Sequence, residues 1–271
     1  MIQEGKQTGL PAAQLGYLWA TLAGSYQDAA DAEKALAAYE HALQLLATDP
    51  EAKANYATAL DNMGSLYLEY GRIAEAEKVR KRALAIRHEI GSPLEIGWSE
   101  EHLAEIALVK HRFKDAERGA RSAFDTLSRS GHDVSSEVAS LVILTYAECM
   151  QSKPEEGLLE AERAMRLAEN GLAADSVEQA HVSRALGFAQ WKTRSIAEAE
   201  RSMQNGLRIL RVRLGNTDPT LMAAMYEYRD FLKAMHRGPE VKVIEEQITA
   251  MIPQAKKKSC SGCTVSVYVL R

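Results

Sequence analysis

A pair of small or apolar residues seven positions apart recurs along this chain at a nearly constant period. The first member advances in steps of 41, 40, 41, 42 and 42 residues, through Ala35, Ala76, Ala116, Gly157, Ala199 and Val241. The second members are Ala42, Ala83, Ala123, Ala164, Gly206 and Ile248. Residues seven apart lie on one face of a helix, and small side chains let a second helix approach that face. Six copies at one period predict an array of repeated helix pairs.

The first helix of each pair is expected upstream, with its own pair of packing residues. These are Leu22-Ala23, Met63-Gly64, Leu103-Ala104, Leu144-Thr145, Leu186-Gly187 and Tyr228-Arg229. Turn-forming residues separate the copies, with Gly after a helix and Pro shortly beyond it. The separators are Thr48-Asp49-Pro50, Gly91-Ser92-Pro93, residues 130–133, Asn170-Gly171 and residues 215–219. No strand-like alternation precedes residue 260, so the chain is expected to be all-helical to about Met251.

Composition narrows the classes of function. The chain has 33 basic and 37 acidic residues and a net charge of −4, which does not favour a nucleic-acid partner. No apolar run approaches the roughly 18–20 residues that span a bilayer, so no membrane partner is expected. The N-terminus lacks a basic stretch followed by an apolar core, so no signal peptide is expected. Helical pattern begins near Pro11, which also fits a start inside a longer chain. A reducing cytoplasm is the expected location.

The residues of the first two copies resemble the tetratricopeptide repeat (TPR) family. The first copy matches through Trp19, Leu22, Ala23, Tyr26, Ala35, Tyr39 and Ala42, and the second through Leu60, Met63, Gly64, Tyr67, Ala76 and Ala83. The family's usual period is about 34 residues. The longer period, with the stretch GRIAEAEKVRKRALAIR and the linker Gly-Asn-Thr-Asp-Pro, is similar to the long-repeat subclass seen in kinesin light chains.

The resemblance implies an all-α fold, a right-handed superhelical solenoid of about six helix-turn-helix repeats with a short extended C-terminal tail. The solenoid is expected over residues 12–252 and the tail over 253–271. The six repeats are expected at about residues 16–50, 57–91, 97–131, 138–171, 180–215 and 222–252. Departures from the pattern predict less apolar interfaces where polar residues replace bulky ones, at Glu100, Glu148, Ser183 and Gln190. Arg229 stands where a small residue is usual. A terminal repeat can accommodate such a residue because its outer face is exposed to solvent.

In such an array the first helix of each pair is expected to line a concave groove. A groove with large aromatics beside fixed charges is suited to a peptide or protein partner. The N-terminal half carries acidic groups and the C-terminal half basic ones, so a bound segment would meet a charge gradient. The predicted groove residues are Asp61, Trp98, Glu101, Glu105, Tyr146, His181, Arg184, Phe188, Trp191, Lys192, Tyr226, Asp230 and Lys233.

The C-terminal tail carries a separate signal. Cys260 and Cys263 form a Cys-x-x-Cys pair, which is half of a zinc site or a redox pair. A second pair of ligands is absent from the sequence, so no metal and no cofactor is expected, although a redox or zinc-binding protein remains an alternative. Residues 264–269 then alternate Thr, Ser and Tyr with Val, a strand pattern. Such a strand could dock in the groove or pair with a second copy, giving self-association.

No motif for catalysis is present. The seven histidines are scattered, and there is no His-Glu-x-x-His, glycine-rich phosphate loop or Gly-x-Ser-x-Gly. The basic residues Lys78, Arg80, Lys81, Arg82 and Arg87 interleave with acidic ones on a second helix and are expected to form a solvated face. The sequence therefore predicts a non-enzymatic scaffold that binds a peptide or protein segment. A structural spacer and a regulator acting on nucleic acid through another chain are the competing hypotheses.

Overall fold

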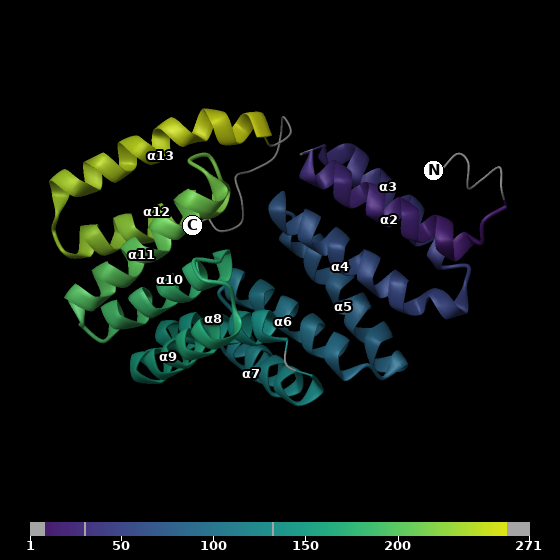
Figure 1. Cartoon of the computed structure of the whole chain (residues 1–271), viewed down its shortest axis with the longest axis horizontal. Helices are drawn as coiled ribbons and strands as arrows, with labels where there is room; N and C mark the ends of the chain where they lie inside the picture. Colours follow the sequence, from purple (N-terminus) through teal and green to yellow (C-terminus); the bar gives the residue numbers. More distant parts are fainter. Residues whose placement is uncertain (1–8, 30, 132, 259–271) are drawn as a thin grey trace. The chain divides into compact units, whose positions relative to one another are not determined.

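The structure, a computed structural model, describes residues 9–29, 31–131 and 133–258. Over these residues it contains twelve α-helices, a 3-10 turn at Pro50–Ala52 and no strand (Figure 1). The helices are α2 (Ala12–Asp28), α3 (Ala32–Leu46), α4 (Lys53–Glu69), α5 (Ile73–Ile90), α6 (Pro93–Val109), α7 (Phe113–Ser130), α8 (Val134–Met150), α9 (Pro154–Gly171), α10 (Val177–Lys192), α11 (Ile196–Leu214), α12 (Pro219–Ala234) and α13 (Gly238–Lys258).

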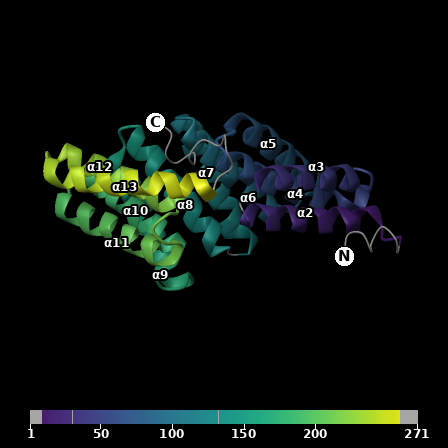
Figure 2. The same ribbon diagram turned by 90° about the horizontal axis from the view of Figure 1, so that it is seen from above.

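Consecutive helices pack as pairs, most extensively α2 with α3, α4 with α5, α8 with α9 and α10 with α11. Figure 2, turned by 90° from Figure 1, shows α2 and α3 side by side. The predicted fold class, an all-α solenoid of helix-turn-helix repeats, is confirmed. Helix α13 continues to Lys258, past the expected solenoid end at residue 252. The strand-like residues 264–269 and both tail cysteines lie outside the described residues.

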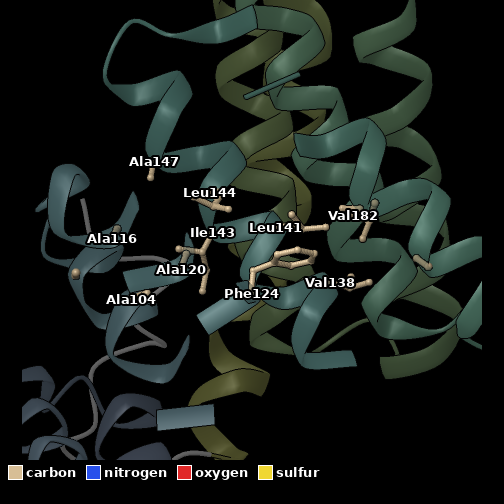
Figure 3. Packing of buried hydrophobic residues seen from close by; sticks show 13 residues of the cluster. Ala104, Ala116, Ala120, Phe124, Val138, Leu141, Ile143, Leu144, Ala147 and Val182 are labelled. Carbon is tan, nitrogen blue, oxygen red and sulfur yellow. The ribbon is translucent and has the colours of Figure 1, made fainter. Parts of the chain in front are cut away.

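The chain divides within α6 into two compact parts, one ending at Ser99 and the other running from Glu100 to Ala255. The core of the first part lies between α3, α4 and α5 and includes Leu46, Tyr56 and Leu60. The core of the second part lies between α6 and α10 and is centred on Phe124, Leu141 and Leu144. Figure 3 shows the ring of Phe124 projecting from α7 towards Leu141 and Val138 of α8.

Side-chain caps and glycines explain where the helices begin and end. Asp133 precedes α8 and accepts a hydrogen bond from the Ser136 amide at 3.4 Å, and Ser176 caps α10 in the same way from the Gln179 amide at 3.2 Å. Such caps satisfy first-turn amides that have no partner within the helix. Helix α5 ends at Gly91, whose φ of 75° is the left-handed conformation that glycine adopts without strain.

The periodic small residues occupy the helix–helix contacts that the sequence assigned to them. Eight of them are fully buried at 0 % exposure: Ala35, Ala42, Ala76, Ala83, Ala116, Ala123, Ala164 and Ala199. Helices α10 and α11 show why the positions are small. A Cβ added at Gly187 would lie 2.9 Å from the carbonyl oxygen of Ala199, and one added at Gly206 would lie 2.9 Å from that of Ala180. Two backbones this close leave no room for a larger side chain.

The four polar departures from the repeat pattern are each matched by a polar group on a second helix. Within α6–α7, the Ser122 hydroxyl donates to Glu100 at 2.9 Å. Within α10–α11, Asn205 donates to the Ser183 hydroxyl at 3.1 Å, and Ser202 donates to the Gln190 carbonyl at 2.8 Å. The fourth, Glu148, is bonded by an arginine of α7. The prediction of less apolar interfaces at these positions is confirmed, because buried polar groups need partners.

Arginine Arg121 holds Glu148 and connects it to a wider cluster of charges. Its Nη2 donates to Glu148 Oε1 at 2.6 Å, and its Nη1 lies 3.6 Å from Glu160 of α9. Glu117, one turn before Arg121 on α7, is bound in turn by Lys153 at 2.9 Å. Glu148 itself is 2 % exposed. The interface between α7, α8 and α9 therefore contains a buried carboxylate in a crowded ionic network.

The basic residues of α5 do not form the fully solvated face expected from the sequence. Arg80 and Arg87 are each only 3 % exposed. Arg80 donates to the Ser65 hydroxyl of α4 at 3.1 Å, and Arg87 pairs with Asp61. The expectation was wrong for these two because both lie on the face of α5 that packs against α4.

Candidate functional site

Aromatic rings from three first helices form a continuous row in the second part of the chain. Tyr146 of α8 lies 5.0 Å from Phe188 of α10, measured between ring centroids. Phe188 contacts Trp191 at 5.9 Å, and Trp191 contacts Phe231 of α12 at 5.8 Å, both edge to face. Aromatic pairs at these separations stabilise each other beyond their buried area. We call Tyr146, Arg184, Phe188, Trp191, Lys192 and Glu227 the first-helix face.

Lys192 places a positive charge over this row. Its ammonium lies 5.0 Å from the Phe188 centroid and 4.7 Å from the Trp191 centroid, within the range of cation–π attraction. The side chain is exposed. Among the described residues the Lys192 ammonium forms no ion pair. An incoming anionic group would therefore not need to displace a carboxylate of the described residues.

A carboxylate that the sequence analysis missed connects two of the predicted residues. Glu227 of α12 accepts a hydrogen bond from the Tyr146 hydroxyl at 2.8 Å through Oε1. Its Oε2 accepts from Arg184 Nε at 3.0 Å and lies 2.9 Å from Arg184 Nη2. Burial and the charge of Glu227 raise the pKa of the Tyr146 phenol well above its usual value. Tyr146 is therefore a neutral donor at physiological pH.

His181 lies one turn before Arg184 and is neutral at pH 7. Burial, then the neighbouring Arg184, lower its pKa to about 4, against the opposing effect of Glu105 and Glu178. Its Nδ1 lies 3.4 Å from Arg184 Nη1. Because a guanidinium only donates, Nδ1 must be the unprotonated nitrogen. Arg184 is thus held between a neutral imidazole and a carboxylate, and its charge is compensated within the chain.

The predicted groove residues from the N-terminal half behave differently. Asp61 is 4 % exposed and pairs with Arg87, so its carboxylate does not face solvent as predicted. Glu101 is buried, with an oxygen 3.7 Å from His102 Nε2. Trp98 and Glu105 are half-buried. Asp61 therefore does not contribute its charge to the predicted gradient, because an arginine of its own repeat neutralises it.

The predicted residues of α12 are engaged with their neighbours. Asp230 pairs with Arg229 at 2.7 Å, and the Arg229 guanidinium in turn lies 4.7 Å from the Tyr226 ring centroid. Lys233 pairs with Glu245 of α13 at 2.7 Å. Two other residues of α12 contact these helices: Glu227 bonds Tyr146 of α8 and Arg184 of α10, and Phe231 contacts Trp191 of α10. The sequence held a signal for these two residues, because they are four positions apart and one of them is acidic and could pair with Arg184. The sequence analysis instead placed Tyr226 and Asp230 on this face, one residue earlier.

A shallow depression of about 360 Å³ lies in the first part of the chain, at α2 and the start of α4. Its lining includes Leu10, Leu18 and Asn55, together with Tyr17, whose side chain is 59 % exposed. The lining carries no charged group. It is thus a shallow apolar surface with one aromatic ring.

No metal or redox centre is visible in the part of the chain that the structure describes. These residues contain no group of three or more His, Cys, Asp or Glu side chains able to hold a metal ion. Cys149 is a free, buried cysteine, and burial raises the pKa of its thiol to about 12, so it is not a reactive thiolate. Cys260 and Cys263 lie outside the described residues. None of the described helices has the length and apolar character needed to cross a membrane.

Comparisons with known proteins bear on the family. Residues 15–89 match the tetratricopeptide repeat family, and this range spans most of α2 to α5. Among curated proteins no match is found.

Solved structures share the fold at low sequence identity. The apo form of RapI is 15% identical, with a TM-score of 0.74 over 94% of this chain and 88% of that one. A Rap protein complexed with competence and sporulation factor is 10% identical, with a TM-score of 0.65 over 90% of this chain and 77% of that one. A putative kinesin light chain of Podosopora anserina with TPR-like repeats is 16% identical, with a TM-score of 0.57 over 74% of this chain and 96% of that one.

These likenesses confirm the resemblance stated from the sequence, the kinesin-light-chain-like repeats included. The family pattern lies in the first two helix pairs, and the fold extends through the pairs that follow. Residues 15–89 therefore carry the tetratricopeptide repeat pattern, and the rest of the chain shares the fold of the TPR-like repeat structures it matches.

Proposed function

We propose that this chain is a non-catalytic scaffold that binds a peptide or protein segment along the first-helix face. The observation that carries the proposal is the group of Phe188, Trp191 and Lys192 on α10, where an exposed ammonium lies over two rings and forms no ion pair among the described residues. Large rigid rings beside an available charge are typical of binding hot spots. The row lies on helices rather than loops, so it is presented with little loss of conformational entropy on binding.

The fold likeness supports the same proposal. One of the similar structures holds a Rap protein complexed with competence and sporulation factor. A helical-repeat array of this kind therefore takes a partner in at least one case. The neutral His181 and the paired Arg184 leave Lys192 as the cation most available to a ligand on this face. We infer that the preferred segment places an apolar or aromatic side chain on the row and a carboxylate near Lys192.

Replacing Trp191 with Ala should weaken binding of a peptide selected on this chain at least tenfold, because truncating a hot-spot aromatic costs about 2 kcal/mol or more. Peptides would be selected from a displayed random library on the immobilised full-length chain, and the affinity of the best one measured by titration. Replacing Lys192 with Ala should weaken the same peptide several-fold and reduce the salt dependence of its affinity, because an ionic contact is lost.

The matched control is Leu159→Ala on α9, a second helix, where the side chain is 66 % exposed. Its affinity should stay within twofold of the unaltered chain. A library that yields no binding peptide, or a peptide bound equally well by the Trp191→Ala variant, would contradict the proposal.

A further inference from the structure

The hydrogen bond between Tyr146 and Glu227 joins two repeats that are not neighbours. Tyr146 is on α8, the first helix of repeat four, and Glu227 is on α12, the first helix of repeat six. The two residues are 81 positions apart in the chain, and the contact is 2.8 Å long. In arrays of helical repeats each repeat normally contacts only the adjacent ones. The contact therefore passes over α10, the first helix of repeat five.

Glu227 also holds the helix that lies between. While Oε1 accepts from Tyr146, Oε2 accepts from Arg184 of α10 at 3.0 Å. Arg184 and Glu227 are mostly shielded, with 12 % and 15 % of their side chains exposed. Charge-assisted hydrogen bonds are roughly twice as strong as neutral ones. One carboxylate thus makes directed bonds to two other helices at the same time.

The aromatic row crosses the same three helices beside these bonds. Tyr146 keeps its ring against Phe188 of α10 while its hydroxyl reaches α12. Trp191 of α10 meets Phe231, which lies one turn after Glu227 on α12. Separating any one of the three helices would break ring contacts and a hydrogen bond together.

We propose that Glu227 is a positioning residue that joins repeats four, five and six into one cooperative block. The block would present the aromatic row to a ligand already assembled, and this consequence rests on the proposed function. In a simple array each repeat is stabilised only by its immediate neighbours. Repeat six would then open locally without affecting repeat four. The Tyr146–Glu227–Arg184 contacts remove that independence.

Hydrogen exchange of the full-length chain without ligand tests the block. Tyr146→Phe keeps the ring and removes only the hydroxyl. We expect the slowest amides of α8 and of α12 to exchange at least tenfold faster in this variant, with those of α4 unchanged. Glu227→Ala should have the same effect on both helices. Glu227→Gln, which keeps a neutral acceptor for the tyrosine, should have a smaller one.

Tyr228→Phe is the matched control because it also removes a tyrosine–glutamate hydrogen bond, but between adjacent helices. The Tyr228 hydroxyl donates to Glu200 of α11 at 3.0 Å and accepts from Gln204 at 3.0 Å. This variant should speed exchange in α11 and α12 and leave α8 unchanged. Exchange in α8 that is unaffected by Tyr146→Phe, or that responds equally to Tyr228→Phe, would overturn the proposal.

Affinity for the selected peptide then tests the consequence. Tyr146→Phe should weaken binding at least threefold, and Tyr228→Phe should leave it within twofold. If the exchange pattern holds while Trp191→Ala binds as well as the unaltered chain, the proposed function fails and the cooperative block stands. If Trp191→Ala loses binding while α8 and α12 exchange independently in the unaltered chain, the block fails and the proposed function stands.

Discussion

Replacing Asp61 with Ala is expected to destabilise the chain by about 3 kcal/mol, the lower end of the cost of breaking a buried ion pair, because Arg87 keeps a second carboxylate, Glu95 Oε2, 3.6 Å from its Nε. Asp61 is 4 % exposed and its partner Arg87 is 3 % exposed. The guanidinium also donates to the fully buried Ser99 hydroxyl at 2.6 Å, so it cannot turn out to solvent without breaking this bond as well. The free energy of unfolding, measured by urea denaturation followed by circular dichroism, checks the prediction.

Two controls separate the buried charge from the loss of packing. Changing Asp61 to Leu together with Arg87 to Met removes both charges and should recover most of the stability, because an apolar pair of similar volume commonly replaces a buried ion pair without loss. The exposed pair Arg201–Glu198 gives the surface reference. Glu198→Ala should change stability by less than about 1 kcal/mol. An Asp61→Ala variant as stable as this surface variant would contradict the account of repeat two.

Raising the pH from 4 to 8 is expected to lower the free energy of unfolding of the unaltered chain by roughly 3 kcal/mol relative to that of its Glu148→Gln variant. The size follows because a pKa that differs by one between the folded and unfolded chain corresponds to about 1.4 kcal/mol. Burial, then the nearby Glu160, raise the pKa of Glu148 from 4.5 to about 7, although Arg121 acts in the opposite direction. A carboxyl group whose folded pKa is raised stabilises the fold fully below its unfolded pKa. That contribution is lost as the pH rises through the folded value, here between about 4.5 and 7.

The difference between the two proteins removes the effect of titrating groups that do not interact with Glu148. Glu117 has a pKa lowered by its hydrogen bonds to Lys153 and Gln151, against the effect of burial, so it contributes in the opposite direction at lower pH. That contribution cancels between the two proteins, except for the part that comes from repulsion between Glu117 and Glu148. Urea denaturation at half-unit steps of pH gives the curve. A difference between the two proteins that is constant from pH 4 to 8 would show that the pKa of Glu148 is the same in the folded and the unfolded chain, and would contradict the prediction.

The periodic small residues made the fold predictable because small side chains mark the places where two helix backbones lie close together. A position that is Ala or Gly in five of the six copies marks a contact between helices, and the eight anchor alanines are buried as this requires. The polar departures were also informative, since Glu148 and Ser183 each have a polar partner on a second helix. The end of α13 was harder to place, since helical residues continue through Pro253 to Lys258.

The candidate site was predictable within one helix and less so between helices. Arg184, Phe188 and Trp191 follow the spacing of one face of α10, and the structure brings them together on that face. The partners Glu227 and Phe231 depend on how far α12 is rotated against α10, which a period of 42 residues does not determine. Asp61 was misplaced for a similar reason. Its position looked solvent-facing in the repeat, but Arg87 on the facing helix draws it into a buried pair.

The central claim, that the first helices of repeats four to six bind a peptide or protein segment, is tested most directly by a map of where a ligand touches the chain. Hydrogen exchange of the full-length chain would be measured with and without the peptide selected from the displayed library. The account predicts slower exchange in α8, α10 and α12, strongest around Trp191 and Lys192, and little change in α9 and α11. Protection confined to α9 and α11, with α10 unaffected, would contradict it.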